Sequence, residues 1–103
     1  MARTPIHPGE ILKDELDGLG IAAAELARQI EVPANRISQI VAGKRAVTAD
    51  TALRLGRWFG TSAEFWMNLQ QLYELDLARK RLGDTVSRLP QRPATPALGD
   101  LPA

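Results

Sequence analysis

Two short helical patterns separated by a tight break constrain this chain more than any other feature of its sequence. In residues 22–30 the small and apolar side chains lie on one helix face, and they are Ala23, Leu26, Ala27 and Ile30. Val32 and Pro33 interrupt this pattern, and a second one begins at Pro33 and ends before Gly43. Because alanines on the first segment let two helices cross closely, the sequence predicts a helix-turn-helix over residues 22–42.

Three further segments have helical spacing, and they cover residues 8–20, 48–59 and 62–82. Pro8 suits the first turn of a helix, where its missing N–H is not needed. Thr48 is the predicted N-cap of the fourth helix, and Thr61 with Glu64 is predicted to form a capping box before the fifth. No segment shows the alternation of a strand. We therefore expect an all-α fold of five helices.

A chain of 103 residues has room for one domain, which we place at residues 7–82. Beyond this domain, prolines stand among small and polar residues at Pro90, Pro93, Pro96 and Pro102. Such a segment buries too little apolar surface to offset its chain entropy. Residues 83–103 are therefore predicted to be a disordered tail.

Charge is unevenly distributed along the chain, although the formal net charge is only +1. Residues 28–57 contain six basic residues and two acidic ones, whereas residues 1–27 contain two basic residues and five acidic ones. A local basic surface on a nearly neutral protein favours contact with phosphates, since counterion release depends on the local patch. The alternative, from charge alone, is an ordinary solvated surface.

The second helix of the motif has a polar face opposite its apolar one. Ile37 and Ile40 face inward, whereas Asn35 and Gln39 point outward. Asn and Gln can pair with adenine edges, Arg with guanine, and Ser with a base or a phosphate, while basic residues after the helix can meet phosphates. The predicted DNA-binding residues are Ala34, Asn35, Arg36, Ser38, Gln39, Ala42, Lys44 and Arg45. The alternative is a solvent-exposed polar face that binds nothing.

The sequence offers no evident metal site, cofactor site or catalytic centre. It has no cysteine and a single histidine, His7, so neither a disulfide nor the usual zinc ligands are available. No nucleophile or orienting partner accompanies His7, which we place at the start of the first helix. Without a run of about 18 apolar residues or a secretory signal, the chain is expected to be cytoplasmic and to lack a membrane segment.

Four motifs combine in residues 7–78, and they are HPGEIL at 7–12, VPANRIS at 32–38, GKRAVTADTALRL at 43–55 and FWMNLQ at 65–70. Together they resemble the HigA-type antitoxins of the Xre/Cro helix-turn-helix superfamily. The resemblance implies a five-helix, lambda-repressor-like fold that binds operator DNA as a homodimer and represses its own operon. It also implies a partner, a HigB-type toxin of the RelE-like kind that cleaves mRNA on the ribosome.

Two residues depart from the pattern of that family. Glu31 stands in the turn where the family usually has glycine, at a position that suits a positive φ. We therefore expect Glu31 to adopt a left-handed conformation with strain of about 1 kcal/mol. Ala22 stands where the family often has a serine cap, so a phosphate contact from that side chain is not available.

The fifth helix has an apolar surface wider than one core contact requires. One stripe consists of Phe65, Leu69 and Leu72, and a neighbouring one of Trp66, Tyr73 and Leu77. The predicted dimer interface consists of Trp66, Leu69, Tyr73 and Leu77, and a two-fold dimer would set its two reading helices about 34 Å apart. The alternative is that Trp66 and Tyr73 complete a small monomer core.

Two other functions stay open at the level of the sequence. The chain can be a free-standing Xre-type repressor without a toxin, or a protein-interaction module whose helix-turn-helix has lost DNA binding. An enzyme is the least favoured class, because no catalytic constellation can be assembled from these residues.

Overall fold

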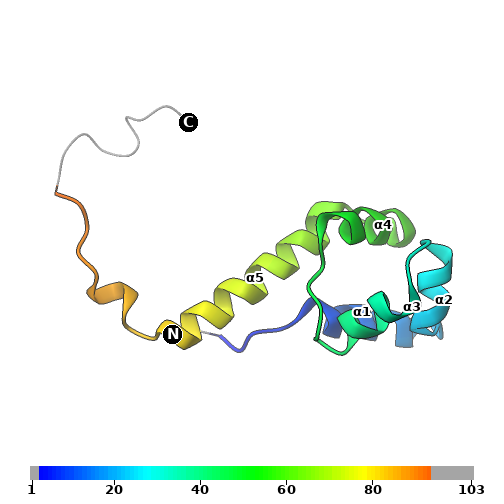
Figure 1. Cartoon of the computed structure of the whole chain (residues 1–103), viewed down its shortest axis with the longest axis horizontal. Coiled ribbons are helices and arrows are strands. Elements are labelled where there is room, and N and C mark those ends of the chain that lie inside the picture. Colours follow the sequence, from blue (N-terminus) through cyan, green and yellow to red (C-terminus); the bar gives the residue numbers. More distant parts are fainter. Residues whose placement is uncertain (1–2, 94–103) are drawn as a thin grey trace.

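A computed structural model describes residues 3–93 and confirms the predicted all-α fold of five helices. The helices are α1 (Pro8–Leu19), α2 (Ala23–Gln29), α3 (Ala34–Val41), α4 (Ala49–Phe59) and α5 (Ala63–Leu82), and a 3-10 helix, η1 (Val86–Arg88), follows. Figure 1 shows α1 to α4 gathered into a compact body, from which α5 extends as a long arm. No strand occurs within the described range.

The apolar faces of the helices meet in one core. The large aliphatic side chains without exposed surface come from four helices and are Leu12, Leu26, Ile37, Ile40 and Leu55. Trp66 of α5 joins them with 1% of its surface exposed. Full burial of one such side chain contributes about 1.5–3 kcal/mol. Because Ile37 and Ile40 are buried as predicted, the opposite side of α3 faces outward.

α1 begins with a capping arrangement built on His7. The Nδ1 atom of His7 accepts a hydrogen bond from the Gly9 N–H at 2.8 Å, and the Glu10 carboxylate accepts one from the His7 N–H at 3.1 Å. Pro8 occupies the first helical position, as predicted. A Cβ at Gly9 would overlap the carbonyl oxygen of Ile40, so only glycine lets the start of α1 pack against the end of α3.

The start of α5 differs in detail from its prediction. Ser62 is the N-cap, and its Oγ accepts a hydrogen bond from the Phe65 N–H at 3.1 Å. The Oγ1 atom of Thr61 instead accepts a hydrogen bond from the indole N–H of Trp66 at 3.1 Å. The predicted capping box of Thr61 and Glu64 is therefore wrong, because the N-cap is Ser62, with Phe65 three positions on, and Thr61 is bonded to the buried Trp66.

The extended segment before α1 is fastened to the arm formed by α5. The Arg3 guanidinium donates to the Asp76 carboxylate at 2.8 Å, although only 4% of the Asp76 surface is exposed. Arg79 pairs with the same carboxylate at 3.3 Å. The rings of His7 and Tyr73 meet edge to face, with centroids 4.8 Å apart. These contacts fix the direction of α5 relative to α1.

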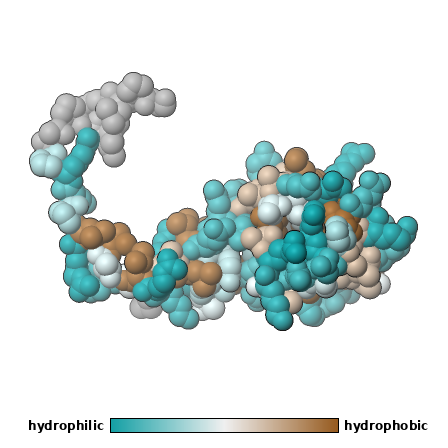
Figure 2. Space-filling model, viewed as in Figure 1, coloured by the Kyte–Doolittle hydropathy of each residue, from teal (hydrophilic) through white to brown (hydrophobic). Residues whose placement is uncertain are grey.

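Beyond α5, the described part of the predicted tail contains η1 and otherwise no regular structure. Val86 and Leu89 are 55% and 58% exposed. Figure 2 shows apolar residues gathered over the end of the arm. Residues 94–103, which the sequence also assigns to a disordered tail, lie outside the described residues. Within residues 3–93, no helix is both long and apolar enough to cross a membrane.

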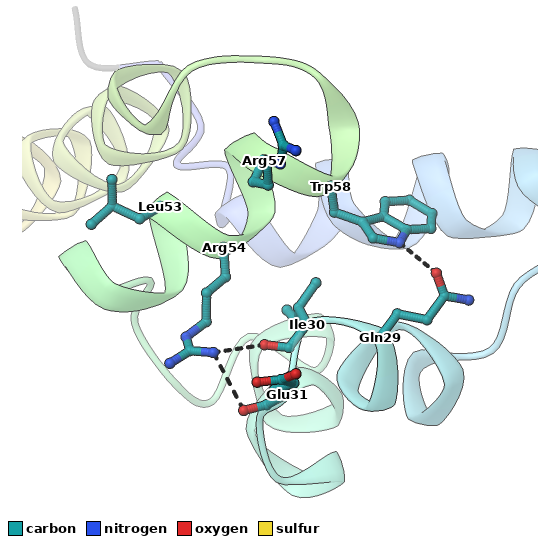
Figure 3. Close-up of a pocket in the computed structure, with 7 residues that line it drawn as sticks. All are labelled: Gln29, Ile30, Glu31, Leu53, Arg54, Arg57 and Trp58. Atoms are coloured by element: carbon teal, nitrogen blue, oxygen red, sulfur yellow. Dashed lines mark hydrogen bonds between the residues drawn. The ribbon is translucent and has the colours of Figure 1, made fainter.

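The turn between α2 and α3 holds Glu31 in the predicted left-handed conformation, with φ 62°. It is the one non-glycine residue with positive φ among residues 3–93. Arg54 of α4 reaches this turn, and its Nη1 donates to the carbonyl of Ile30 at 2.8 Å and to that of Glu31 at 3.4 Å (Figure 3). Pro33 occupies the N-cap of α3, one residue before its predicted place in the first turn.

Replacing Glu31 by glycine should stabilise the protein. Glycine adopts a positive φ without the Cβ repulsion that a glutamate meets there, and the Arg54 bonds to the two carbonyls are unaffected. We expect the free energy of unfolding of Glu31→Gly to rise by about 1 kcal/mol. Urea denaturation followed by circular dichroism measures this change.

The matched control is Glu31→Ala, which removes the carboxylate and retains the Cβ. Its stability should stay close to that of the wild type or fall, because the backbone strain persists. A stability of Glu31→Gly at or below that of the wild type would contradict the account of the turn.

His7 should make stability depend on pH in the mildly acidic range. Burial lowers the pKa of His7 below its ordinary value of 6.5, against smaller raising effects of the Arg45 backbone and Glu10. The folded protein therefore favours neutral His7, so stability is complete above pH 6.5 and is lost as pH falls below it. In His7→Asn, which has no titrating group at the cap, urea denaturation at a series of pH values should give a flatter profile. An equally steep profile in the variant would rule out His7 as the cause.

Candidate nucleic-acid interface

α3 carries the predicted DNA-reading residues on its outer side. Asn35 and Ser38 are exposed, whereas Arg36 and Gln39 are half-buried at the edges of this face. The small exposed residues at its two ends are Ala34 and Ala42. An α-helix with its side chains is about 10–12 Å in diameter, which matches the width of the DNA major groove. The geometry therefore leaves this polar face free to enter a groove.

The loop after α3 turns sharply and exposes two basic side chains. Gly43 has φ 75°, and its N–H donates to the carbonyl of Ile40 at 2.9 Å. The Lys44 N–H donates to the carbonyl of Gln39 at 2.8 Å. These two hydrogen bonds satisfy carbonyls at the end of the helix. Lys44 and Arg45 are both exposed. The loop lies beside the start of α1, since a Cβ at Gly43 would be 3.8 Å from Cγ of His7.

Two side chains that can read bases are already paired within the chain. The Nε atom of Arg45 donates to Oε1 of Gln39 at 2.8 Å. The Nη1 atom of Arg36 lies 3.5 Å from Oδ1 of Asp50. Pairs of this kind near solvent are weak, of the order of 0.2–1 kcal/mol. Both side chains can therefore exchange or extend these contacts when a base edge or a phosphate is present.

Ion pairs reduce the net positive charge of the basic surface predicted for residues 28–57. Arg28 pairs with Glu25 on α2 at 2.6 Å, and Arg54 pairs with Asp50 on α4 at 2.7 Å. The hydrogen bond from Arg54 lowers the pKa of the Asp50 carboxyl, which is therefore charged at neutral pH. The basic side chains closest to the reading face of α3 are Arg36, Lys44 and Arg45.

Sequence reasoning missed the roles of Asp50 and Arg54. A cleft of about 220 Å³ opens beside the reading face, and it is lined by Arg36, Arg45, Ala46, Thr48, Asp50 and Thr51. The spacing of four residues between Asp50 and Arg54 is a signal for their ion pair. Nothing in the local sequence indicates that Arg54 also reaches the carbonyl of Ile30, 24 positions away.

The predicted dimer residues of α5 are only partly exposed. Trp66 lies in the core, 1% exposed and with its ring centroid 5.4 Å from that of Phe59, which corrects its prediction as a dimer contact. Leu69 and Tyr73 are half-buried, and Leu77 is 40% exposed. The exposed large apolar side chains of α5 are Phe65, Leu72, Leu75, Leu77 and Leu82. These side chains leave apolar surface on the arm that a partner can cover.

The described part of the chain contains no group of three or more His, Cys, Asp or Glu side chains able to hold a metal ion. The one histidine is engaged in capping α1, through the hydrogen bond from the Gly9 N–H.

Known proteins resemble this chain in both sequence and fold. The helix-turn-helix family matches residues 12–66. Virulence-associated protein I of Dichelobacter nodosus is 49% identical over 76 residues, which cover 73% of this chain and 70% of that protein. The structure of an addiction module antidote protein of the HigA family from Coxiella burnetii is 45% identical, with a TM-score of 0.80, and covers 92% of this chain and 100% of its own. Pseudomonas aeruginosa antitoxin HigA, solved with the higBA promoter, is 46% identical, with a TM-score of 0.81 and coverage of 88% and 100%.

The fold and the outward polar face of α3 define a helix-turn-helix protein. The family match covers more than half of the chain, and its structural relatives are HigA antitoxins that align over nearly their whole length. The chain belongs to the Xre-type helix-turn-helix family, among its HigA-type antitoxins.

Two substitutions on this surface should have different effects on DNA binding. Lys44→Ala should weaken binding to every duplex and reduce the slope of log affinity on log salt by about 0.9, since one phosphate contact is lost. Gln39→Ala should weaken binding to the operator alone, by about 1–3 kcal/mol, since it removes a base contact. Fluorescence anisotropy titrations at several salt concentrations measure both effects.

The control for Lys44 is Arg57→Ala, which removes an exposed basic side chain of α4 that lines the pocket drawn in Figure 3. It should change neither the affinity nor the salt slope by a comparable amount. Equal losses from Arg57→Ala and Lys44→Ala, or an equal loss on all duplexes from Gln39→Ala, would reject this assignment of contacts.

Proposed function

We propose that this chain is the antitoxin of a type II toxin-antitoxin module, which binds operator DNA as a homodimer and represses its own operon. We further propose that it neutralises a HigB-type, RelE-like toxin that cleaves mRNA. The observation that carries the proposal is the exposed polar face of α3, with Lys44 and Arg45 beside it. The names of the HigA relatives, one of them solved with the higBA promoter, support the antitoxin and the operator.

In the proposed complex α3 lies in the major groove. Asn35 and Gln39 present side-chain amides that can each form two hydrogen bonds with an adenine edge. Lys44 and Arg45 stand where the chain leaves the groove, and they contact phosphates without specifying sequence. The core contacts of Ile37 and Ile40 hold the backbone of α3 while these contacts form.

The dimer part of the proposal rests on the arm formed by α5. Leu72 and Leu75 lie three positions apart on one side of the helix and are 42% and 49% exposed, so they form an apolar surface that a partner can cover, whereas Leu77, 40% exposed, lies on another side. A second copy related by a two-fold axis would cover the same residues on both arms. Such a dimer places two α3 helices about 34 Å apart, which is one turn of DNA.

A titration of the chain against its own promoter tests the DNA-binding part. At a fixed salt concentration, the promoter should bind at least about 1,000-fold more tightly than a shuffled duplex of the same length and composition. Equal affinity for both duplexes would reject the operator and favour a protein-interaction module.

Co-expression with the neighbouring open reading frame tests the antitoxin part. The neighbour's product alone should stop growth, and growth should return when this chain is produced with it. The two proteins should also elute together in size-exclusion chromatography. If operator binding holds and the neighbour is harmless, the chain is a free-standing repressor and the antitoxin part is wrong.

Charged substitutions on the arm should dissociate the dimer. A double variant, Leu72→Glu and Leu75→Glu, places two carboxylates in the proposed apolar interface, so sedimentation equilibrium should give a monomer where the wild type gives a dimer. Leu19→Glu is the control, because Leu19 is 54% exposed on α1 and should leave the dimer intact. A wild type that is monomeric well above micromolar concentration would contradict this interface.

A further inference from the structure

Asp50 stands between the reading face of α3 and the turn that precedes it. It belongs to the first turn of α4, and its side chain is 57% exposed. One of its oxygens, Oδ1, accepts a hydrogen bond from Arg54 Nε at 2.7 Å and lies 3.5 Å from Arg36 Nη1. The same carboxylate oxygen therefore contacts an arginine that holds the turn and an arginine at the edge of the reading face.

The two arginines differ in how firmly they are held. Arg54 donates to Asp50 and to the carbonyls of Ile30 and Glu31, so its guanidinium is fixed by three acceptors. Arg36 has the longer contact of 3.5 Å, and its side chain is 30% exposed. Arg54 thus fixes the Asp50 carboxylate in place. Arg36 contacts this carboxylate through one nitrogen, so most of its five N–H donors stay available for other acceptors.

We propose that Asp50 is a positioning residue for DNA specificity, which directs the Arg36 guanidinium toward a base edge and withholds it from phosphates. This inference rests on the proposed function, since it concerns recognition of operator DNA. When Nη1 of the Arg36 guanidinium contacts a carboxylate, its other N–H groups can still form a bidentate contact with guanine. The carboxylate, which it shares with Arg54, also offsets part of the Arg36 charge, so Arg36 gains less from a phosphate alone.

The location of the carboxylate also penalises wrong complexes. Asp50 shares its cleft with Arg45 and Thr48, at the edge of the surface that faces the DNA backbone in the proposed complex. A duplex bound out of register brings phosphates toward this carboxylate, which offsets part of the attraction that Arg36 and Arg45 exert on them. Asp50 therefore lowers affinity for non-specific DNA more than affinity for the operator.

The isosteric variant Asp50→Asn removes the charge and keeps an acceptor for Arg36 and Arg54. We expect its affinity for shuffled DNA to rise about threefold, from the size of an exposed ion pair, while its affinity for the promoter changes little. The salt slope on shuffled DNA should steepen by about 0.9, because Arg36 becomes free to neutralise one phosphate. Asp50→Glu retains the charge and should restore the wild-type ratio of the two affinities.

A double-mutant cycle shows whether Asp50 acts through Arg36. In an Arg36→Ala background, Asp50→Asn should no longer steepen the salt slope on shuffled DNA. Arg54→Gln serves as the structural control, because it loosens the turn and should lower thermal stability together with affinity for both duplexes. Melting temperatures of all variants identify any loss of fold, and Asp50→Ser provides a second neutral side chain at the position.

The outcomes separate this inference from the proposed function. If the wild type does not prefer its promoter, both fail. If the wild type prefers its promoter and Asp50→Asn keeps the wild-type ratio and salt slope, the inference alone fails. It fails also if the variant loses affinity for both duplexes in parallel with stability, as Arg54→Gln should, or if the steeper slope persists in the Arg36→Ala background.

Discussion

The left-handed turn at Glu31, held by the Arg54 guanidinium, is the constraint on which the rest of the structure depends. α2 and α3 can cross closely only if the chain reverses at Ile30 and Glu31, and a reversal leaves carbonyls that neither helix satisfies. Arg54 satisfies two of them from α4. The angle between the two helices of the motif is thus set by a residue outside the motif.

The two sides of α3 are fixed by different forces. Its inner side is fixed by burial of Ile37 and Ile40 and by the close approach of Gly9 to the end of the helix. Its outer edge is adjusted by charge, since Asp50 connects Arg36 to the arginine that holds the turn. Hydrophobic burial and the turn held by Arg54 together determine where the reading face points, and the Asp50 carboxylate contacts an arginine at its edge.

Local patterns predicted the helices well, because apolar spacing and glycine ends are properties of neighbouring residues. The resemblance predicted the positive φ of Glu31. The family usually has glycine in this turn, and a residue that replaces the glycine has to adopt the same left-handed conformation. Contacts between distant positions could not be predicted in this way, and Arg3 with Asp76 is an example separated by 73 positions. Trp66 was predicted for a dimer surface because helical spacing does not distinguish a core face from an interface.

The central claim is that α3, oriented by this turn, reads operator DNA from a two-fold dimer. Hydroxyl-radical footprinting of the chain on its own promoter tests that claim most directly. We expect two protected half-sites on one face of the duplex, with centres about 10 base pairs or a multiple of that apart, related by a palindrome. A single unpaired footprint, or protection spread evenly along the promoter, would contradict it.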